Sequence, residues 1–243
     1  MKVFKDKYLV VIIIFGVTIR VLLNNVIYSK DAESFVFWGR YLTTHSISEM
    51  FVTLPGGFTP LPPFYYYLMR VLATMDKFIN VLQNEWLTYL IFKIPPVSAE
   101  ILATVLIYKF VGKLFDKKKA ILAAGFYFLH PAIVYNTAVF GQIDSFISVA
   151  AFVAVLMLIE KKYLFGLIIY IVGFLSKLQA LAVLPLVATL TILSIHVKKL
   201  FKYGFILAIL ALLPFVPMLL TRGALWNIKY FYQLQNWYPY TSI

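Results

Sequence analysis

The sequence contains no cysteine and little charge, and both absences limit what the chain can be. Without cysteine it has no disulfide framework, no thiolate metal ligand and no cysteine nucleophile. Its three histidines lie far apart, which argues against a histidine-based metal site. Only 13% of the 243 residues are charged, about half the share of a typical soluble domain. We therefore expect a membrane protein rather than a soluble globule, and we expect no metal or other cofactor.

Apolar residues dominate what is present. Hydrophobic residues make up 62% of the chain and aromatic residues 18%, and the mean hydropathy is +0.87. Such a composition excludes a disordered chain. The first apolar run begins at Tyr8, is too long for a signal-peptide core and is followed by no small-residue cleavage site. The composition thus predicts an all-α membrane protein whose first helix is retained.

Basic residues outnumber acidic ones, which gives a net charge of +12. Many of the lysines form tight groups between apolar stretches, a pattern typical of cytoplasmic loops. The groups are Lys2/Lys5/Lys7, Lys113/Lys117/Lys118/Lys119, Lys161/Lys162 and Lys198/Lys199/Lys202. The positive charge therefore indicates orientation in a lipid bilayer and attraction to anionic headgroups, and we expect no nucleic-acid partner.

Several apolar runs have, or nearly have, the about 20 residues that a bilayer crossing needs. They cover residues 8–28, 89–112, 120–140, 145–159, 163–176, 179–196 and 204–221. If every lysine group is cytoplasmic, these runs predict seven transmembrane helices, a cytoplasmic N-terminus, and outside loops at 29–88 and 222–243. The apolar piece 61–82 begins with prolines and carries charges, so we expect it to lie along the interface. A crossing by this piece is the competing topology.

The predicted topology gathers the unusual polar residues on the non-cytoplasmic face. These residues are Asp31, Glu33, Gln142, Asp144, Lys177 and Gln179. The runs 145–159 and 163–176 are short, because at 1.5 Å per residue they reach roughly 21–23 Å of a ~30 Å hydrocarbon core. We therefore expect an outward-facing depression walled by the turns at their outer ends. The membrane can be a plasma membrane or an ER-type membrane.

The acidic candidates also have ordinary structural interpretations. Asp31 can be the N-cap of a short helix, with Phe35 and Trp38 as interfacial aromatics. Asp144 can cap the helix that follows Gly141, since a helical hairpin favours glycine at the end of one helix and aspartate at the start of the next.

The other charged residues within or beside apolar runs have such interpretations too. Lys177 can extend to the headgroups, although an ionisable residue at membrane depth is a functional candidate. Arg20 is expected to pair with an outside carboxylate or to reach the headgroups. Lys93 and Glu100, which flank a Pro-Pro pair, are expected to form a local ion pair. The His130-Pro131 step predicts a kinked helix with a core histidine.

Taken in order, several stretches resemble the GT-C superfamily, the integral-membrane glycosyltransferases that use polyprenyl- or dolichyl-phosphate sugars. The stretches are Asp31-x-x-x-Phe35-x-x-Trp38, Pro62-Pro63-Phe64-Tyr65, Lys93-Ile94-Pro95 with Glu100, His130-Pro131, Phe140-Gly141-Gln142-Ile143-Asp144-Ser145, Lys177-x-Gln179 and Leu184-Pro185. They run through nearly the whole chain and are most similar to the mannosyltransferase-type members. Phe140 stands where those members have tryptophan, and Glu100 stands where an aspartate is common.

The resemblance implies a fold and an activity. The fold is a single module over 1–243 with seven helices, interfacial helices in the first outside loop at 29–88, and a second outside loop that begins at 222–243. Members continue with further helices, so we expect an N-terminal fragment. The implied activity is transfer of a hexose, with mannose favoured, from a polyprenyl- or dolichyl-phosphate donor to a hydroxyl of a glycan, lipid or protein acceptor, with inversion.

The resemblance also implies roles for single residues. The base of the family lies in the first outside loop, which by position falls on Asp31. Substrate binding falls on Glu33, Gln142, Asp144 and Gln179, and donor-phosphate binding on Lys177 and Arg222. The lipid phosphate is itself the leaving group, so no nucleotide is needed, and the chain has no glycine-rich nucleotide loop.

Two other functions remain open. A transporter or channel would use Arg20, Asp144 and Lys177 at a midplane site, but the two halves show no convincing repeat and the charges gather at one face. A non-catalytic membrane subunit that binds lipid-linked sugar is the other alternative.

Overall fold

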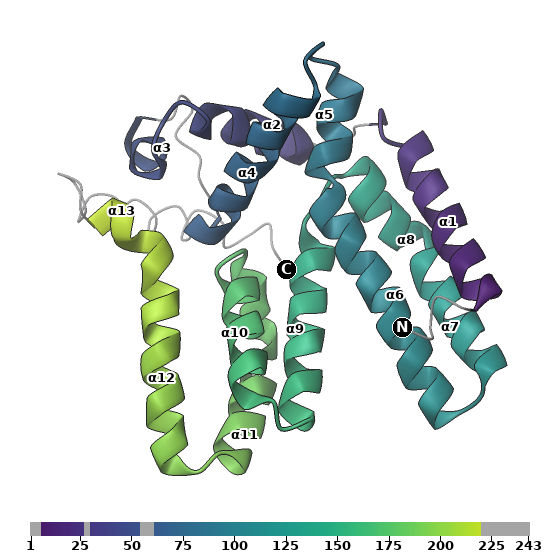
Figure 1. The fold of residues 1–243 in the computed structure, drawn as a ribbon, viewed down its shortest axis with the longest axis vertical. Coiled ribbons are helices and arrows are strands. Elements are labelled where there is room, and N and C mark those ends of the chain that lie inside the picture. The colour runs from purple at the N-terminus through teal and green to yellow at the C-terminus, as the bar shows by residue number, and fades with distance from the viewer. Residues whose placement is uncertain (1–5, 27–29, 54–60, 220–243) are drawn as a thin grey trace. The chain divides into compact units, whose positions relative to one another are not determined.

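The structure is a computed structural model that describes residues 6–26, 30–53 and 61–219. Within these ranges the chain is α-helical and has no β-strand, which confirms the all-α fold class. The chain forms two compact units (Figure 1). The first unit comprises 1–37 and 75–149, and the second comprises 38–74 and 150–243.

The unit boundaries fall inside three helices, α2 (Lys30–Leu42), α4 (Pro63–Ile79) and α9 (Asp144–Ile159). The other elements of the first unit are α1 (Lys7–Leu22), α5 (Glu85–Phe92), α6 (Ile94–Leu114), α7 (Lys117–Phe128), α8 (Pro131–Val134) and the π-helix η2 (Tyr135–Val139). Those of the second are α3 (Ile47–Thr53), α10 (Tyr163–Phe174), the 3-10 helix η3 (Leu178–Val183), α11 (Leu184–Ser194), α12 (Val197–Leu212), the 3-10 helix η4 (Leu213–Phe215) and α13 (Val216–Leu219).

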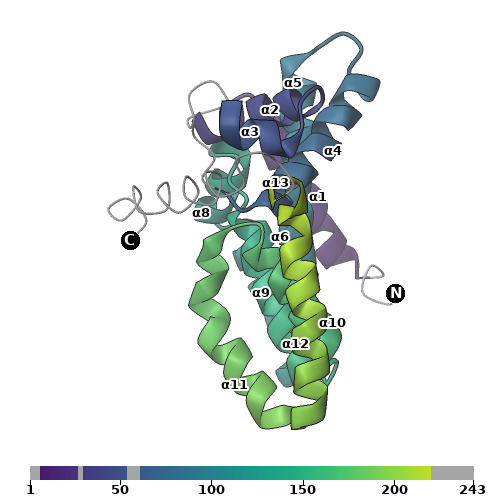
Figure 2. The ribbon, with the colours of Figure 1, turned by 90° about the vertical axis from the view of Figure 1, so that its left-hand side faces the viewer.

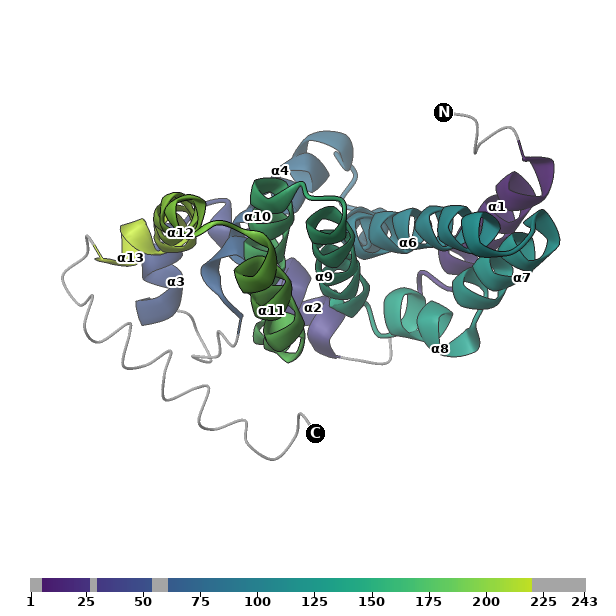
Figure 3. The ribbon, with the colours of Figure 1, turned by 90° about the horizontal axis from the view of Figure 1, so that it is seen from below.

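The first unit is built around α6 and α7, with α1 packed on α7 (Figure 3). The close approach of α1 depends on Gly16, where a Cβ would lie 2.5 Å from the ring of Phe128. Phe128 is fully buried. Because glycine has no side chain, the two helices can come near enough to bury this ring between them.

One end of the first unit is tied together by Asp6. Its Oδ1 accepts a hydrogen bond from the backbone N–H of Tyr8 at 3.0 Å and so caps α1. Its Oδ2 lies 2.8 Å from the hydroxyl of Tyr108 in α6 and 2.9 Å from Nζ of Lys117 in α7. The start of α1 and the connection between α6 and α7 therefore lie at the same end.

The opposite end of the first unit is tied together by Lys93, which is 6% exposed. Its Nζ donates to the carbonyl of Asn24 at 3.0 Å and to that of Ala138 at 2.7 Å. The end of α1, the start of α6 and the end of η2 therefore meet here. The expected ion pair between Lys93 and Glu100 is wrong, because the amine binds these two carbonyls and Glu100 binds Arg20 instead.

The His130-Pro131 step breaks the helix as expected. α7 ends before it and α8 begins at Pro131, with a bend of 43° between the two parts. The imidazole Nδ1 of His130 accepts from the N–H of Ala132 at 3.2 Å, so the histidine is a partly exposed helix cap rather than a core residue.

Helix length identifies one described helix, α6 with 21 residues, that could cross a membrane alone. α7 together with α8 and η2 would qualify as one bent span. α9, α10 and the pair η3–α11 are apolar but shorter. The expected interfacial piece 61–82 forms α4, one of several helices in the expected outside loop 29–88.

In the second unit α10 packs against α12 and η3. A Cβ at Gly166 of α10 would lie 2.9 Å from the carbonyl oxygen of Ala154, so α9 and α10 approach closely. α11 and α12 meet at a tight turn and diverge from it (Figure 2). An apolar cavity of about 400 Å³ lies between α4, α10 and α12, where the hydroxyl of Tyr67 donates to the carbonyl of Pro214 at 3.2 Å.

Candidate functional site

Two residues of the expected site meet in the first unit. Oδ2 of Asp31 accepts a hydrogen bond from Nε2 of Gln142, although the two are 111 positions apart in the sequence. Asp31 is partly exposed in the first turn of α2, and Gln142 is partly exposed in the turn between η2 and α9. A carboxylate and an amide that the sequence keeps far apart are thus side by side.

The turn that carries Gln142 is shaped by Gly141. Its φ is +68°, the left-handed conformation expected of a glycine at the end of a helix. A Cβ at this position would lie 2.8 Å from Cβ of Ala32, so the turn packs directly on the start of α2. The backbone N–H of Gln142 reaches back to the carbonyl of Asn136 at 3.0 Å. These contacts hold the turn so that the Gln142 amide lies beside the carboxylate of Asp31.

The other acidic candidates of the first unit lie nearby in sequence. Asp144 is partly exposed and is the first residue of α9, where the positive end of the helix dipole favours a carboxylate. The helix begins at Asp144, as expected, but Asp144 is its first residue rather than the residue before it, so its capping role stays a prediction. Asp31 lies inside the first turn of α2 after Lys30, so its interpretation as the N-cap is wrong. Glu33 is exposed.

Two of the aromatic residues that follow Asp31 are buried. Phe35 is 8% exposed in the first unit. Trp38 is 5% exposed in the second unit, where its ring meets that of Tyr66 edge-on at 5.5 Å. They are core residues, so the interpretation of them as interfacial aromatics is wrong.

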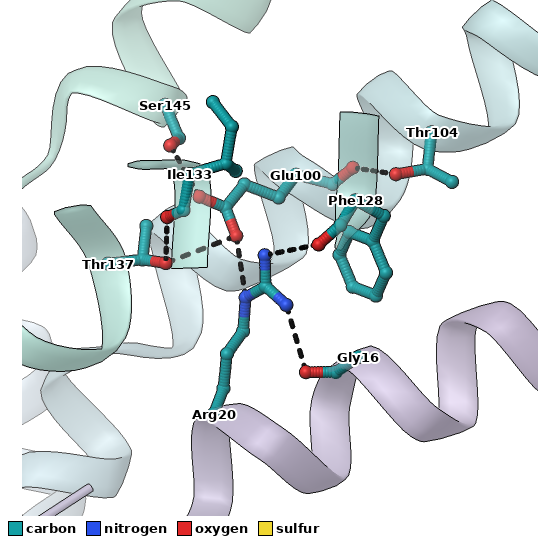
Figure 4. A network of polar contacts seen from close by, with 8 residues as sticks. All are labelled: Gly16, Arg20, Glu100, Thr104, Phe128, Ile133, Thr137 and Ser145. Atoms are coloured by element: carbon teal, nitrogen blue, oxygen red, sulfur yellow. Dashed lines mark hydrogen bonds and ion pairs between the residues drawn. The ribbon is translucent and has the colours of Figure 1, made fainter. Parts of the chain in front are cut away.

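A buried ion pair joins α1 and α6 in the first unit (Figure 4). Nε of Arg20 is 2.8 Å from Oε2 of Glu100, and the two residues are 4% and 0% exposed. The remaining guanidinium nitrogens donate to the carbonyls of Gly16 at 2.9 Å and Phe128 at 3.0 Å. The guanidinium also lies 4.2 Å from the centre of the Phe128 ring. Every nitrogen of Arg20 therefore has an acceptor.

Glu100 binds two hydroxyls besides Arg20. Its Oε1 accepts from Oγ of Ser145 at 2.7 Å and its Oε2 accepts from Oγ1 of Thr137 at 3.2 Å. Oγ1 of Thr104 donates to the backbone carbonyl of Glu100 at 2.7 Å (Figure 4). The carboxylate thus joins α1, α6, η2 and α9.

Of the two alternatives given for Arg20, pairing with a carboxylate is the one that the structure shows. Sequence reasoning did not identify Glu100 as the partner, because it paired Glu100 with the nearby Lys93. Ser145 belongs to a stretch that carries the resemblance but was given no role, and Thr137 gave no signal, because a hydroxyl in an apolar helix ordinarily bonds to its own backbone.

Lys93 and Asn24 line a cavity of about 170 Å³ whose other walls are mostly apolar side chains of α1 and α6. Among the described residues, Oδ1 of Asn24 is buried and has no hydrogen-bond partner. No three His, Cys, Asp or Glu side chains come together anywhere in the described ranges in a way that could hold a metal ion.

The remaining expected site residues belong to the second unit or lie outside the described residues. Lys177 is partly exposed and precedes η3, in which Gln179 is exposed. The hydroxyl of Tyr170 in α10 donates to the carbonyl of Ala180 at 3.0 Å and so fixes this turn. Arg222 lies outside the described residues.

No profile of a known protein family matches the sequence, and no curated protein matches it.

Proposed function

We propose that the chain is an integral-membrane glycosyltransferase. It transfers a hexose, with mannose favoured, from a polyprenyl-phosphate donor to an acceptor hydroxyl with inversion, on the non-cytoplasmic face of a plasma membrane or ER-type membrane. The observation that carries the proposal is the pairing of Asp31 with Gln142 across the fold. It joins two of the stretches that together carry the resemblance to GT-C enzymes.

The exposed surface supports the location in a bilayer. Only 33% of the most apolar window of α6 is buried. Phe126 of α7 is 74% exposed, and Phe201 and Leu193 of the second unit are 77% and 81% exposed. Large apolar side chains at such exposure are unfavourable in water and favourable in lipid.

The first unit supports the proposed orientation. Asp6 holds the start of α1 against the connection between α6 and α7, so Lys7 of the first lysine group lies at the same end as Lys117 of the second. Asp31 and Gln142 belong to the other end, because the neighbouring Gly141 would place a Cβ 3.9 Å from Cε of Lys93. α6 separates these ends by about 30 Å at 1.5 Å per residue. With the lysines in the cytoplasm, Asp31 faces the other side.

The chemistry assigned to Asp31 is general-base catalysis. Its carboxylate takes the proton of the acceptor hydroxyl while that oxygen bonds to the anomeric carbon of the sugar. The bond from this carbon to the phosphate oxygen breaks on the opposite side, so the configuration inverts and the lipid phosphate leaves with the electron pair. Gln142 orients the carboxylate, since a base must be aimed at the proton that it removes.

Binding of the departing phosphate is assigned to Lys177, with Arg222. A fixed cation stabilises the negative charge that develops on the leaving group. Glu33, Asp144 and Gln179 are assigned to the acceptor or the donor sugar, and Asp144 adds a carboxylate that can accept sugar hydroxyls.

The test compares two Asp→Asn variants of the full chain in membranes supplied with polyprenyl-phosphate mannose and candidate acceptors. Asp31→Asn should lower the transfer rate by about 100-fold or more, because it removes the base. Asp116→Asn is the matched control, since this aspartate caps α7 at the lysine end and asparagine also caps helices. Its rate should equal that of the wild type.

The alternatives predict other results. Near-normal transfer by Asp31→Asn would show that the base is a different residue. If the wild-type protein consumes no lipid-linked sugar, the glycosyltransferase proposal is wrong, and movement of a labelled solute across the membrane would then favour the transporter.

A further inference from the structure

The carboxylate of Glu100 touches both sides of the turn that carries Gln142. Thr137, one of its hydroxyl partners, lies in η2 just before the turn, and Ser145, the other, lies in α9 just after it (Figure 4). Glu100 comes from α6, far from both in sequence. A single buried side chain therefore holds the two ends of the turn together.

The same turn also meets α2. A Cβ at Gly141 would lie 2.8 Å from Cβ of Ala32, and Gln142 donates to Asp31. The turn is thus held by Glu100, through Thr137 and Ser145, and by the start of α2; we call the contacts of Glu100 with these two hydroxyls the clamp. A shift of the turn would move the Gln142 amide relative to the Asp31 carboxylate.

A carboxylate suits this place better than an apolar side chain of similar size. Hydrogen bonds to an ionised acceptor are short and strong, and the bond from Ser145 is 2.7 Å long. Burial of the charge is unfavourable by itself, and Arg20 compensates for it at 2.8 Å. An apolar residue would fill the space without fixing either hydroxyl.

The local helix geometry adds to the argument. η2 is a π-helix over Tyr135–Val139, a wide turn that is rare and is frequently found at functional sites. Thr137 lies in its middle and also donates to the carbonyl of Ile133 at 3.1 Å. The wide turn and the clamp thus occur at the same place.

We propose that Glu100 is a positioning residue: through Ser145 and Thr137 it holds the Gly141–Gln142 turn so that the Gln142 amide orients the Asp31 base. The inference rests on the proposed function for its consequence in catalysis, but the clamp itself can be tested without activity.

The first experiment measures placement of the turn. The chain has no cysteine, so the pair Asp31→Cys and Gln142→Cys is unique, and disulfide formation reports how often the two positions meet. Addition of Ser145→Ala, which removes one hydroxyl of the clamp, should lower the rate of disulfide formation several-fold. The matched control is Thr104→Val, which removes an equally buried hydroxyl bound to the backbone carbonyl of Glu100 and should leave the rate unchanged.

Two outcomes of this experiment would overturn the clamp. One is an equal effect of Ser145→Ala and Thr104→Val, which would show a general loss of packing. The other is an absence of cross-linking in the parent pair both by disulfide formation and by a short bifunctional thiol reagent, which would contradict the contact between positions 31 and 142. Ser145→Ala keeps both charges of the network, so the variant is expected to fold, and its thermal unfolding is measured alongside.

The second experiment measures catalysis in the full chain without added cysteines. Ser145→Ala should lower kcat by about tenfold with the donor KM unchanged, because it misplaces a group rather than removing a binding contact. Ser145→Thr, which keeps the hydroxyl, should restore most of kcat. In a Gln142→Ala background Ser145→Ala should have no further effect, since the group that it positions is gone.

The two experiments separate the two proposals. If the effects of Ser145→Ala and Gln142→Ala multiply, Glu100 does not act through Gln142 and the positioning role is wrong. If the wild-type chain transfers no sugar while the disulfide results are as expected, the proposed function fails and the clamp stands.

Discussion

Among single residues, Arg20 and Glu100 set the strongest constraint on the first unit. Two charges that are almost fully buried need each other, because either one alone would remain in a poorly solvating interior. Both residues also have neutral partners, since Arg20 donates to two carbonyls and Glu100 accepts from two hydroxyls. The pair therefore specifies one arrangement of α1 against α6, whereas apolar contacts alone would permit several.

Removal of one charge of the Arg20–Glu100 pair should lower the free energy of unfolding more than removal of both charges. Arg20→Met leaves Glu100 buried without a counter-charge and should lower the free energy of unfolding by about 3–5 kcal/mol. Addition of Glu100→Gln to this variant should recover part of the loss, since no buried charge remains. Reversible unfolding in mixed micelles gives both free energies.

A surface ion pair provides the control for this comparison. Lys162→Met breaks an exposed pair with Glu160 between α9 and α10, and its effect should be much smaller. The single variant Glu100→Gln is measured as well. If the Arg20→Met/Glu100→Gln double variant loses as much free energy of unfolding as the two single variants added together, the two charges are energetically independent. Their pairing is then not what stabilises the unit.

At the level of helices, the sequence predicts the end of one helix and the start of the next where the backbone preference of a single residue determines them. Pro131 starts a new helix because proline cannot continue the old one, and Gly141 ends one because it adopts a positive φ. The start of α9 at Asp144 follows from the same kind of rule. The sequence also predicted that 145–159 and 163–176 are short helices, and the observed helices agree closely.

Partners distant in sequence could not be predicted in the same way. The sequence places Lys93 near Glu100, so a local pair was the natural expectation. The lysine instead binds the backbone carbonyls of Asn24 and Ala138, which are distant in sequence and lie near Lys93 only in the folded chain. The contact of Asp31 with Gln142 was expected from the resemblance and from the common face, but its hydrogen bond depends on how Gly141 meets α2. Side-chain contacts across helices depend on packing that the sequence pattern does not specify.

The start of α1 should respond to acid in a defined range. Hydrogen bonds from Lys117 and Tyr108 hold the pKa of Asp6 at about 2, below its ordinary value of 3.8. A lowered pKa in the folded state means that the carboxylate stabilises the fold above pH 3.8, and that this contribution is lost as the pH falls from there through about 2. The protection factor of the Tyr8 amide, which donates to Asp6, should therefore stay constant from neutral pH down to this range and then fall.

The Asp6→Asn variant is the control for this titration. Its Tyr8 amide should be less protected at neutral pH and should show no change between pH 4 and 2. If the wild-type transition is instead centred on the ordinary value of an aspartate, Asp6 does not receive the two hydrogen bonds in solution.

For the whole molecule, the proposed location in a bilayer leads to a prediction of which helices cross it. The lysine groups lie at helix junctions, between α6 and α7, between α9 and α10, and from the start of α12 onward, and all of these lysines are exposed. That regularity is what lets one side be assigned to the cytoplasm. The two topologies differ in whether α4 crosses the bilayer. α4 has 17 residues and many apolar side chains, but it also carries Arg70, Asp76 and Lys77.

Single cysteines introduced into the cysteine-free chain should decide the topology. With α4 along the interface, Thr44→Cys and Leu82→Cys react with a membrane-impermeant thiol reagent added outside, and Lys118→Cys reacts only from the cytoplasmic side. All three positions are exposed, so failure to react reports the side rather than burial. If α4 crosses, position 82 moves to the cytoplasm and position 118 moves outside while position 44 stays. That pattern would turn the lysines of the α6–α7 connection outward, against the charge rule on which the orientation of Asp31 depends.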